Sequence, residues 1–180
     1  MSKEANASQP LIGRESTTVP GRFGEPLTVE HSVTSRGGFD QHATHPLFLC
    51  LHGWGSSEED MADIMRLIAP YNDFVALRGP LTLAPAREGS PDPGNYAWFH
   101  DGDYDAYAAA TAVDRWVADN IPADRDVVPL GFSQGGLVAV HLLRINPERY
   151  RAVVSLSGFN APGQVPGTAP ADSRLADYDI

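Results

Sequence analysis

Four short apolar runs of the sequence each lead into a turn that contains glycine. They occupy residues 47–51, 74–77, 127–130 and 152–156. None of them alternates with polar residues, as a strand with one exposed face would. Continuous apolar runs of this length are typical of strands that are buried on both faces, and such strands belong to parallel sheets covered by helices. This feature restricts the possible folds more than any other.

Helical periodicity fills the stretches between these runs. Ser56 with Glu59 three residues later resembles a capping box, and apolar residues then recur at helical spacing as far as Ile68. A second apolar stripe follows in residues 106–117, and the segment 134–145 is apolar on most sides, which predicts a buried central helix. Strands that alternate with helices predict an α/β fold, with a mostly parallel sheet and helices on both faces.

The remaining segments are more polar. We expect a flexible N-terminal tail in residues 1–12 and a single domain in residues 13–180. Alternating patterns between residues 15 and 34 predict edge strands around a turn. Residues 81–95 are rich in proline and glycine and are expected to form a long loop. This loop is either ordinary surface or the wall of a substrate groove, because it leaves a strand on the side where α/β sheets carry their sites.

Composition excludes several classes of function. The formal net charge of −10 disfavours nucleic acids and anionic membranes as partners, since phosphate groups require a basic surface. No apolar stretch approaches the roughly 18 residues that a membrane span needs, and the first ten residues lack a signal-peptide region, so a cytoplasmic location is expected. Cys50 is the only cysteine, and the histidines show no ligand spacing, so neither a disulfide within the chain nor a metal site is expected.

One motif carries chemistry. Residues 131–135 read G-x-S-x-G between a predicted strand and a predicted helix, the context required of a nucleophile elbow. Ser133 would stand on a sharp turn, and Gly131 and Gly135 would be needed because a Cβ at either position would clash with the strand or the helix. The competing interpretation is a glycine-rich turn in which the serine only caps the helix.

A second glycine-rich loop, residues 52–55, follows the first apolar run. In an elbow of this kind one oxyanion donor comes from such an early loop, and the other comes from the residue after the nucleophile. The backbone N–H groups of Trp54 and Gln134 are therefore the predicted donors. We expect the ring of His52 to be buried and to brace the loop.

Five segments together resemble a known family: Leu51–Gly55, Arg78–Pro80, Trp98–Phe99, Leu130–Gly136 and Leu156–Phe159. They occur in the order found in the phospholipase/carboxylesterase family of α/β-hydrolases, which includes acyl-protein thioesterases and small bacterial carboxylesterases. The resemblance covers about residues 45–160. It implies a serine hydrolase without a cofactor that acts on small acyl esters or thioesters, with Ser133 as nucleophile. It also implies that Leu81, Leu83, Trp98 and Phe99 lie at the substrate groove.

The other triad members are missing from the expected place. In this fold the order along the chain is Ser, Asp, His, yet no histidine follows His141. The chain is therefore expected to be truncated at its C-terminus and to lack the last strands and helix, with the triad Asp and His. His100 is the better surrogate base within the chain, and a dimer partner supplying the base in trans is a further alternative. The sheet edge left open predicts self-association.

Two functions follow from these observations. The first is a serine carboxylesterase or thioesterase of the resembled family. The second is a non-catalytic protein that binds small molecules in a retained hydrolase pocket, because a serine without a base is a poor nucleophile.

Overall fold

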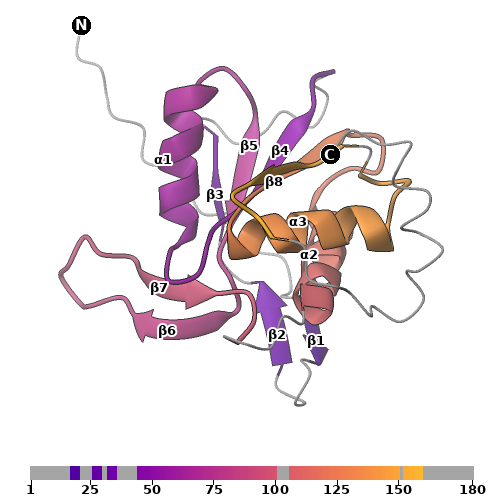
Figure 1. Cartoon of the computed structure of the whole chain (residues 1–180). Helices are drawn as coiled ribbons and strands as arrows, with labels where there is room; N and C mark the ends of the chain where they lie inside the picture. Colours follow the sequence, from indigo (N-terminus) through magenta and orange to yellow (C-terminus); the bar gives the residue numbers. More distant parts are fainter. Residues whose placement is uncertain are drawn as a thin grey trace, which may run out of the picture.

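The computed structural model of the chain describes residues 17–20, 26–29, 32–35, 44–100, 106–150 and 152–159. Its main sheet has the strand order β3-β5-β4-β8-β9 (Figure 1). Neighbours among β4, β5, β8 and β9 are parallel, whereas β3 is antiparallel to β5. The bounds are Ser32–Thr34 (β3), Leu47–Leu51 (β4), Phe74–Leu77 (β5), Val127–Phe132 (β8) and Val154–Leu156 (β9). The four apolar runs thus form the four parallel strands, as predicted.

Helices cover both faces of this sheet (Figure 1). Helix α1 (Glu58–Ile68) packs on one face, and α2 (Ala106–Asn120) and α3 (Gln134–Ile145) lie on the other. Alternate side chains of β4 face opposite ways: Leu49 joins the core under α2 and α3, while Cys50 packs with Met61 of α1. Because both faces of β4, β5 and β8 are covered, these strands contain apolar residues without alternation, whereas β9 at the edge of the described sheet is mostly exposed.

The ends of the helices differ slightly from the predicted ones. The N-cap of α1 is Ser57. The carboxylate of Asp60 accepts hydrogen bonds from the Ser57 backbone N–H (3.2 Å) and from the Ser56 hydroxyl (2.6 Å). The capping box predicted at Ser56 and Glu59 therefore lies one residue further along the chain. Helix α3 has the predicted bounds and is buried over most of its length, as expected of a central helix.

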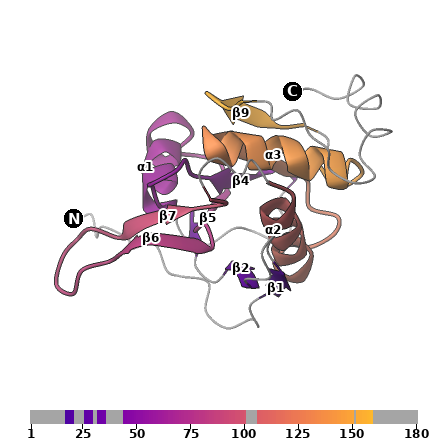
Figure 2. The ribbon, with the colours of Figure 1, turned by 60° about the horizontal axis from the view of Figure 1, so that its bottom comes forward.

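The N-terminal strands form a separate unit. Strands β1 (Thr17–Pro20) and β2 (Pro26–Val29) pair antiparallel in a two-stranded sheet that packs against α2 (Figure 2). Leu27 and Val29 of β2 contribute to the core. Strands were predicted in this region, but only β3 lies at the edge of the main sheet.

The prediction of a long loop at residues 81–95 is wrong. This segment contains strand β6 (Leu81–Pro85), which pairs antiparallel with β7 (Gly94–Ala97) in a hairpin that projects from the body of the molecule (Figures 1 and 2). Most of β6 is exposed, so no core dictates an apolar pattern, and prolines and glycines concentrate around the turn. The sequence signal was therefore that of a loop.

A membrane-spanning helix and a metal-binding cluster can be assessed only for the described residues. No helix among the described residues is long and apolar enough to cross a bilayer. Over the same residues, no group of three or more His, Cys, Asp or Glu side chains is placed to hold a metal ion. The predicted tail, residues 1–12, lies outside the described residues.

Candidate active site

Ser133 forms a sharp turn between β8 and α3. Its φ of 51° and ψ of −113° lie in a region that residues with a side chain rarely adopt. The residue is half-buried at the carboxyl end of β8. A strained serine at the point where a parallel strand enters a helix is the geometry of a nucleophile elbow.

The two glycines of the motif make this turn possible. A Cβ on Gly131 would lie 2.1 Å from the carbonyl oxygen of Gly135, and a Cβ on Gly135 would lie 2.2 Å from that of Leu51. Both obstacles are backbone atoms, which cannot rotate away. The need to avoid these clashes therefore explains both glycines of G-x-S-x-G, as the sequence suggested.

The glycine-rich loop after β4 lies directly beside the elbow. A Cβ on Gly53 would be 3.4 Å from the Cβ of Ser133. Strands β4 and β8 are parallel neighbours, so their carboxyl ends meet at one edge of the sheet. Among the described residues, the backbone N–H groups of Trp54 and Gln134 have no hydrogen-bond acceptor. Two unpaired donors beside a serine, one of them at a helix N-terminus, suit a developing oxyanion.

The ring of His52 braces this loop. Its Nε2 accepts a hydrogen bond from the backbone N–H of Gly79 (2.9 Å), which leaves Nδ1 to donate to the carbonyl oxygen of Gly53 (2.7 Å). Burial lowers the pKa of His52, because desolvation disfavours the charged ring. Because both ring nitrogens are hydrogen-bonded, the ring is neutral and neither nitrogen is available for proton transfer. His52 therefore braces the loop, as expected from the sequence.

Trp98 and Phe99 pass behind the elbow. The indole Nε1–H of Trp98 donates to the carbonyl oxygen of His52 (2.8 Å), and its backbone N–H donates to Oε1 of Gln134 (2.8 Å). Nε2 of Gln134 donates in turn to the carbonyl oxygen of Phe99 (2.9 Å). Trp98 has no exposed surface and Phe99 is 6% exposed. These two residues therefore support the site from beneath rather than from an open wall.

The hairpin carries Leu81 and Leu83, the other two residues predicted to lie at a substrate groove. Leu81 begins β6 opposite Ala97, and it is half-buried against the core that contains Trp98. Leu83 lies nearer the hairpin tip and is exposed. Two further large apolar side chains are exposed at this edge, Trp54 (45%) and Phe132 (44%). Sequence reasoning passed over Phe132, although its position immediately before the nucleophile was a signal that could have identified it.

A partly buried ion pair anchors this edge and was also missed. Arg78 Nε donates to Glu58 Oε2 (2.8 Å), and a second guanidinium nitrogen donates to Glu58 Oε1. The guanidinium lies 4.3 Å from the ring centroid of Tyr96. Backbone hydrogen bonds join Tyr96 to Gly55 and Ser56 (both 2.9 Å), so the hairpin is attached to the loop that carries Trp54. The available signal was an acid at the start of α1 together with the Arg-Gly-Pro turn.

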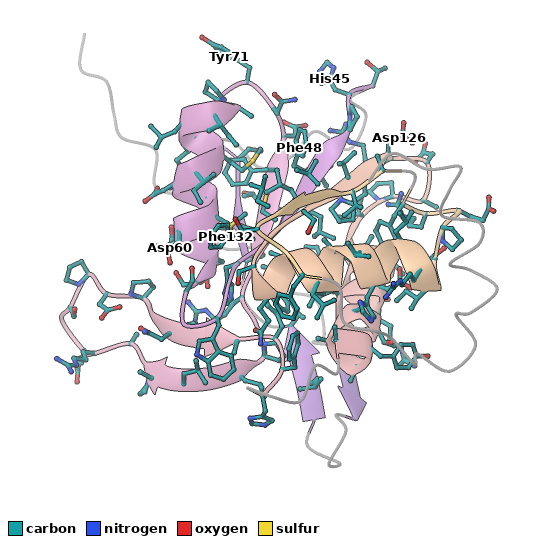
Figure 3. The ribbon with its side chains drawn as sticks, viewed as in Figure 1. His45, Phe48, Asp60, Tyr71, Asp126 and Phe132 are labelled. Carbon is teal, nitrogen blue, oxygen red and sulfur yellow. The ribbon has the colours of Figure 1, made fainter. Side chains whose placement is uncertain are left out.

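The described histidines are distributed away from Ser133 or are engaged elsewhere. Figure 3 shows His45 at the opposite end of the sheet from Phe132. The ring of His141 is buried against the carbonyl oxygen of Leu137, one turn back in α3. His100 is exposed and directly follows Phe99.

Of the remaining candidates for the triad, only Glu148 belongs to the described residues. Among the acids that follow Ser133, Glu148 is exposed beyond the far end of α3. His31, His42, Asp172, Asp177 and Asp179 lie outside the described residues.

Comparison with known proteins agrees with this geometry. The sequence model of the phospholipase/carboxylesterase family matches residues 39–171. The protein described as "Putative esterase NocK" from Nocardia uniformis subsp. tsuyamanensis is 33% identical over 128 residues, which are 69% of this chain and 37% of that protein.

Solved structures show the same fold. A carboxylesterase from Mesorhizobium loti has a TM-score of 0.55 at 21% identity, over 78% of this chain and 64% of that one. A hydrolase from Pseudomonas aeruginosa PA01 has a TM-score of 0.50 at 18% identity, over 89% of this chain and 51% of that one. The chain thus spans less than two thirds of the length of each of these relatives. It belongs to the phospholipase/carboxylesterase family, and its fold is that of the α/β-hydrolases.

Proposed function

We propose that this chain carries the nucleophile and the oxyanion hole of a serine hydrolase that cleaves acyl esters or thioesters. The observation that carries the proposal is the strained Ser133 between Gly131 and Gly135, beside two unpaired backbone N–H groups. Family membership supports hydrolysis as the class of reaction. Hydrolysis is thus the activity of the family, and the assignment of Ser133 as its nucleophile in this chain is the proposal.

The chemistry follows from the geometry of the elbow. The Ser133 hydroxyl oxygen bonds to the acyl carbon, and the carbonyl electron pair moves onto its oxygen. The N–H groups of Trp54 and Gln134 stabilise that oxyanion, and one such donor is worth about 3–4 kcal/mol in the transition state. Collapse expels the alcohol or thiol, and water then hydrolyses the acyl-serine.

The proton of the Ser133 hydroxyl requires a base. His52 is engaged on both ring nitrogens, and His141 is buried within α3. Neither of these rings is therefore proposed as the base, and we assign neither the triad Asp nor the triad His, with His100 kept as the surrogate. Without a base, the oxyanion hole and binding alone leave a residual acceleration of roughly 10³–10⁴ over water.

The acyl group is proposed to lie against the apolar side chains at this edge. Trp54 and Phe132 are exposed close to Ser133, and Leu81 and Leu83 belong to the neighbouring hairpin. Trp98 and Phe99 lie beneath them and keep water away from that side. This surface suits a small-molecule ester or thioester with an apolar acyl chain.

Steady-state hydrolysis of p-nitrophenyl acetate and butyrate tests the proposal. The Ser133→Ala variant should lose the protein-dependent rate, whereas Ser157→Ala, at the matched serine that follows the neighbouring strand, should keep it. Imidazole added as an external base should raise the wild-type rate by more than the rate of Ser133→Ala. Equal rates for wild type and Ser133→Ala, with and without imidazole, would remove Ser133 from the chemistry.

A second candidate is a non-catalytic protein that binds small acyl compounds. It is favoured by the engagement of His52 and His141 away from Ser133. Tryptophan fluorescence titrated with butyrate and with butyl butyrate distinguishes the two functions, because Trp54 is exposed at the site. Saturable quenching without any turnover that depends on Ser133 would favour binding alone.

A further inference from the structure

We infer that the side chains of Gln134 and Trp98 form a clamp that fixes the two oxyanion donors relative to each other. This inference rests on the proposed function, and it assigns positioning roles to two side chains. In the proposal above, Gln134 contributes only its backbone N–H, and Trp98 only lies beneath the apolar side chains.

The first half of the clamp is the amide group of Gln134. It accepts a hydrogen bond from the Trp98 N–H (2.8 Å) and donates one to the Phe99 carbonyl oxygen (2.9 Å). Gln134 is 4% exposed, so both bonds are sheltered from water. Because one amide pairs with groups of two successive residues, the first residue of α3 is held against this segment in a single register.

The second half is the indole of Trp98. Its Nε1–H donates to the carbonyl oxygen of His52 (2.8 Å), and the indole lies tilted against the His52 ring at 5.3 Å between ring centroids. The His52 ring is in turn fixed to Gly53 and Gly79. The peptide that leads to Trp54 is therefore held from both sides, through Trp98 and through the imidazole.

The clamp thus joins two segments whose donors must act together. Trp54 lies in the loop after β4 and Gln134 begins α3, and among the described residues no backbone hydrogen bond joins them directly. Their N–H groups must both reach one oxyanion at hydrogen-bond distance, and a misplacement of about 1 Å can cost as much as about a hundredfold in rate. Breaking the clamp leaves buried polar groups unpaired, so the two segments would shift to satisfy them.

If the side chains of Gln134 and Trp98 had a purely structural role, their substitution would lower stability without moving the two N–H donors. Tyr150→Phe is the matched control for that role. Tyr150 is fully buried, and its hydroxyl donates to Asp114 (2.8 Å) beyond the other end of α3. Loss of this bond should lower the stability of the fold, as the loss of a single buried hydrogen bond does, without moving either N–H donor.

The first experiment measures kcat and KM for p-nitrophenyl acetate with the full chain. Gln134→Met preserves side-chain length but removes both bonds, and Trp98→Phe removes the indole donor. Each should lower kcat about ten- to a hundredfold with KM within about twofold, while Tyr150→Phe keeps both. A Gln134→Met rate within twofold of wild type, with Ser133→Ala inactive, overturns the clamp and leaves the proposed function standing.

The second experiment needs no turnover. In the amide spectrum of ¹⁵N-labelled protein, Gln134→Met and Trp98→Phe should both shift the Trp54 backbone resonance, and Tyr150→Phe should not. Should Gln134→Met fail to fold, Gln134→Glu removes the donor to Phe99 and tests the same coupling. An unmoved Trp54 resonance in the folded variants refutes the clamp, even if Ser133→Ala has already refuted the proposed function.

Discussion

Two neighbouring strands of the sheet lead into serines with almost the same positive φ. Ser133 follows β8 with a φ of 51°, and Ser157 follows β9 with a φ of 50°. The strands pair in parallel, and the Ser133 N–H donates to the carbonyl oxygen of Leu156, so the two turns lie side by side. Only one of them has the surroundings of a nucleophile.

The difference lies in what surrounds each serine. Ser133 is half-buried, has glycines two positions before and after it, and opens α3, whose first N–H is unpaired among the described residues. Ser157 is exposed beside the outermost strand of the described sheet. A strained serine is therefore insufficient for this chemistry. It requires donors that converge on the same point and a rigid support for them.

The largest expected effect is a loss of stability from a steric clash at Gly135. Gly135→Ala places a Cβ 2.2 Å from the Leu51 carbonyl oxygen and should cost about 3 kcal/mol or more in the free energy of unfolding. Gly158→Ala meets the Ser155 hydroxyl, a side-chain atom that can rotate, so it should cost about 1 kcal/mol or less. Urea unfolding followed by tryptophan fluorescence measures both. Equal losses would mean that the two turns are equally constrained.

The next effect concerns the ion pair beneath the Ser133 edge. Arg78→Met leaves the buried Glu58 carboxylate without its partner and should cost about 2–3 kcal/mol. This value lies below the usual range for a buried pair, because Arg78 is partly exposed. The double variant with Glu58→Gln should recover part of the loss in the same urea titration. No recovery would show that the packing of Arg78 on Tyr96 matters more than its charge.

The pH dependence of stability should come in part from His52. Its folded pKa is lowered, so the unfolded chain takes up the proton first, near the ordinary value of about 6.5. The stabilisation is complete above that pH and is lost as the pH falls below it. The difference in unfolding free energy between wild type and His52→Gln should therefore shrink from pH 7.5 to pH 5.5. A constant difference would contradict the neutral, bracing imidazole.

The smallest effect is expected at the second serine. Ser157→Ala should change the unfolding free energy by about 0.5 kcal/mol or less and the rate of ester hydrolysis by less than about twofold. Both are measured with the assays already described. A tenfold loss of rate would bring Ser157 into the site and remove the contrast between the two turns.

Sequence patterns predicted the parts of the molecule in which local residues and burial agree. The runs at β4, β5 and β8 and the apolar helix α3 were correct, because each is buried on nearly all sides. The elbow was equally readable, since Gly131 and Gly135 are required by backbone contacts within a few residues or with the adjacent strand.

Other parts of the molecule have no local sequence pattern that predicts them. The hairpin of β6 and β7 is stabilised by pairing rather than by burial, and its prolines indicated a loop. The Gln134 amide contacts a segment about 35 residues away, and the Trp98 indole contacts a carbonyl 46 residues away. Such contacts between distant segments follow no periodicity, so the support of the proposed oxyanion donors became visible only in three dimensions.

The central claim is that Ser133, and not its strained neighbour, forms the bond to the acyl carbon. Prolonged incubation of the chain with excess fluorophosphonate ester, followed by protease digestion and mass spectrometry, shows which serine is modified. We predict an adduct on the peptide that contains Ser133 and at least tenfold less on the peptide that contains Ser157. Equal modification of both peptides, or modification of Ser157 alone, would contradict the claim.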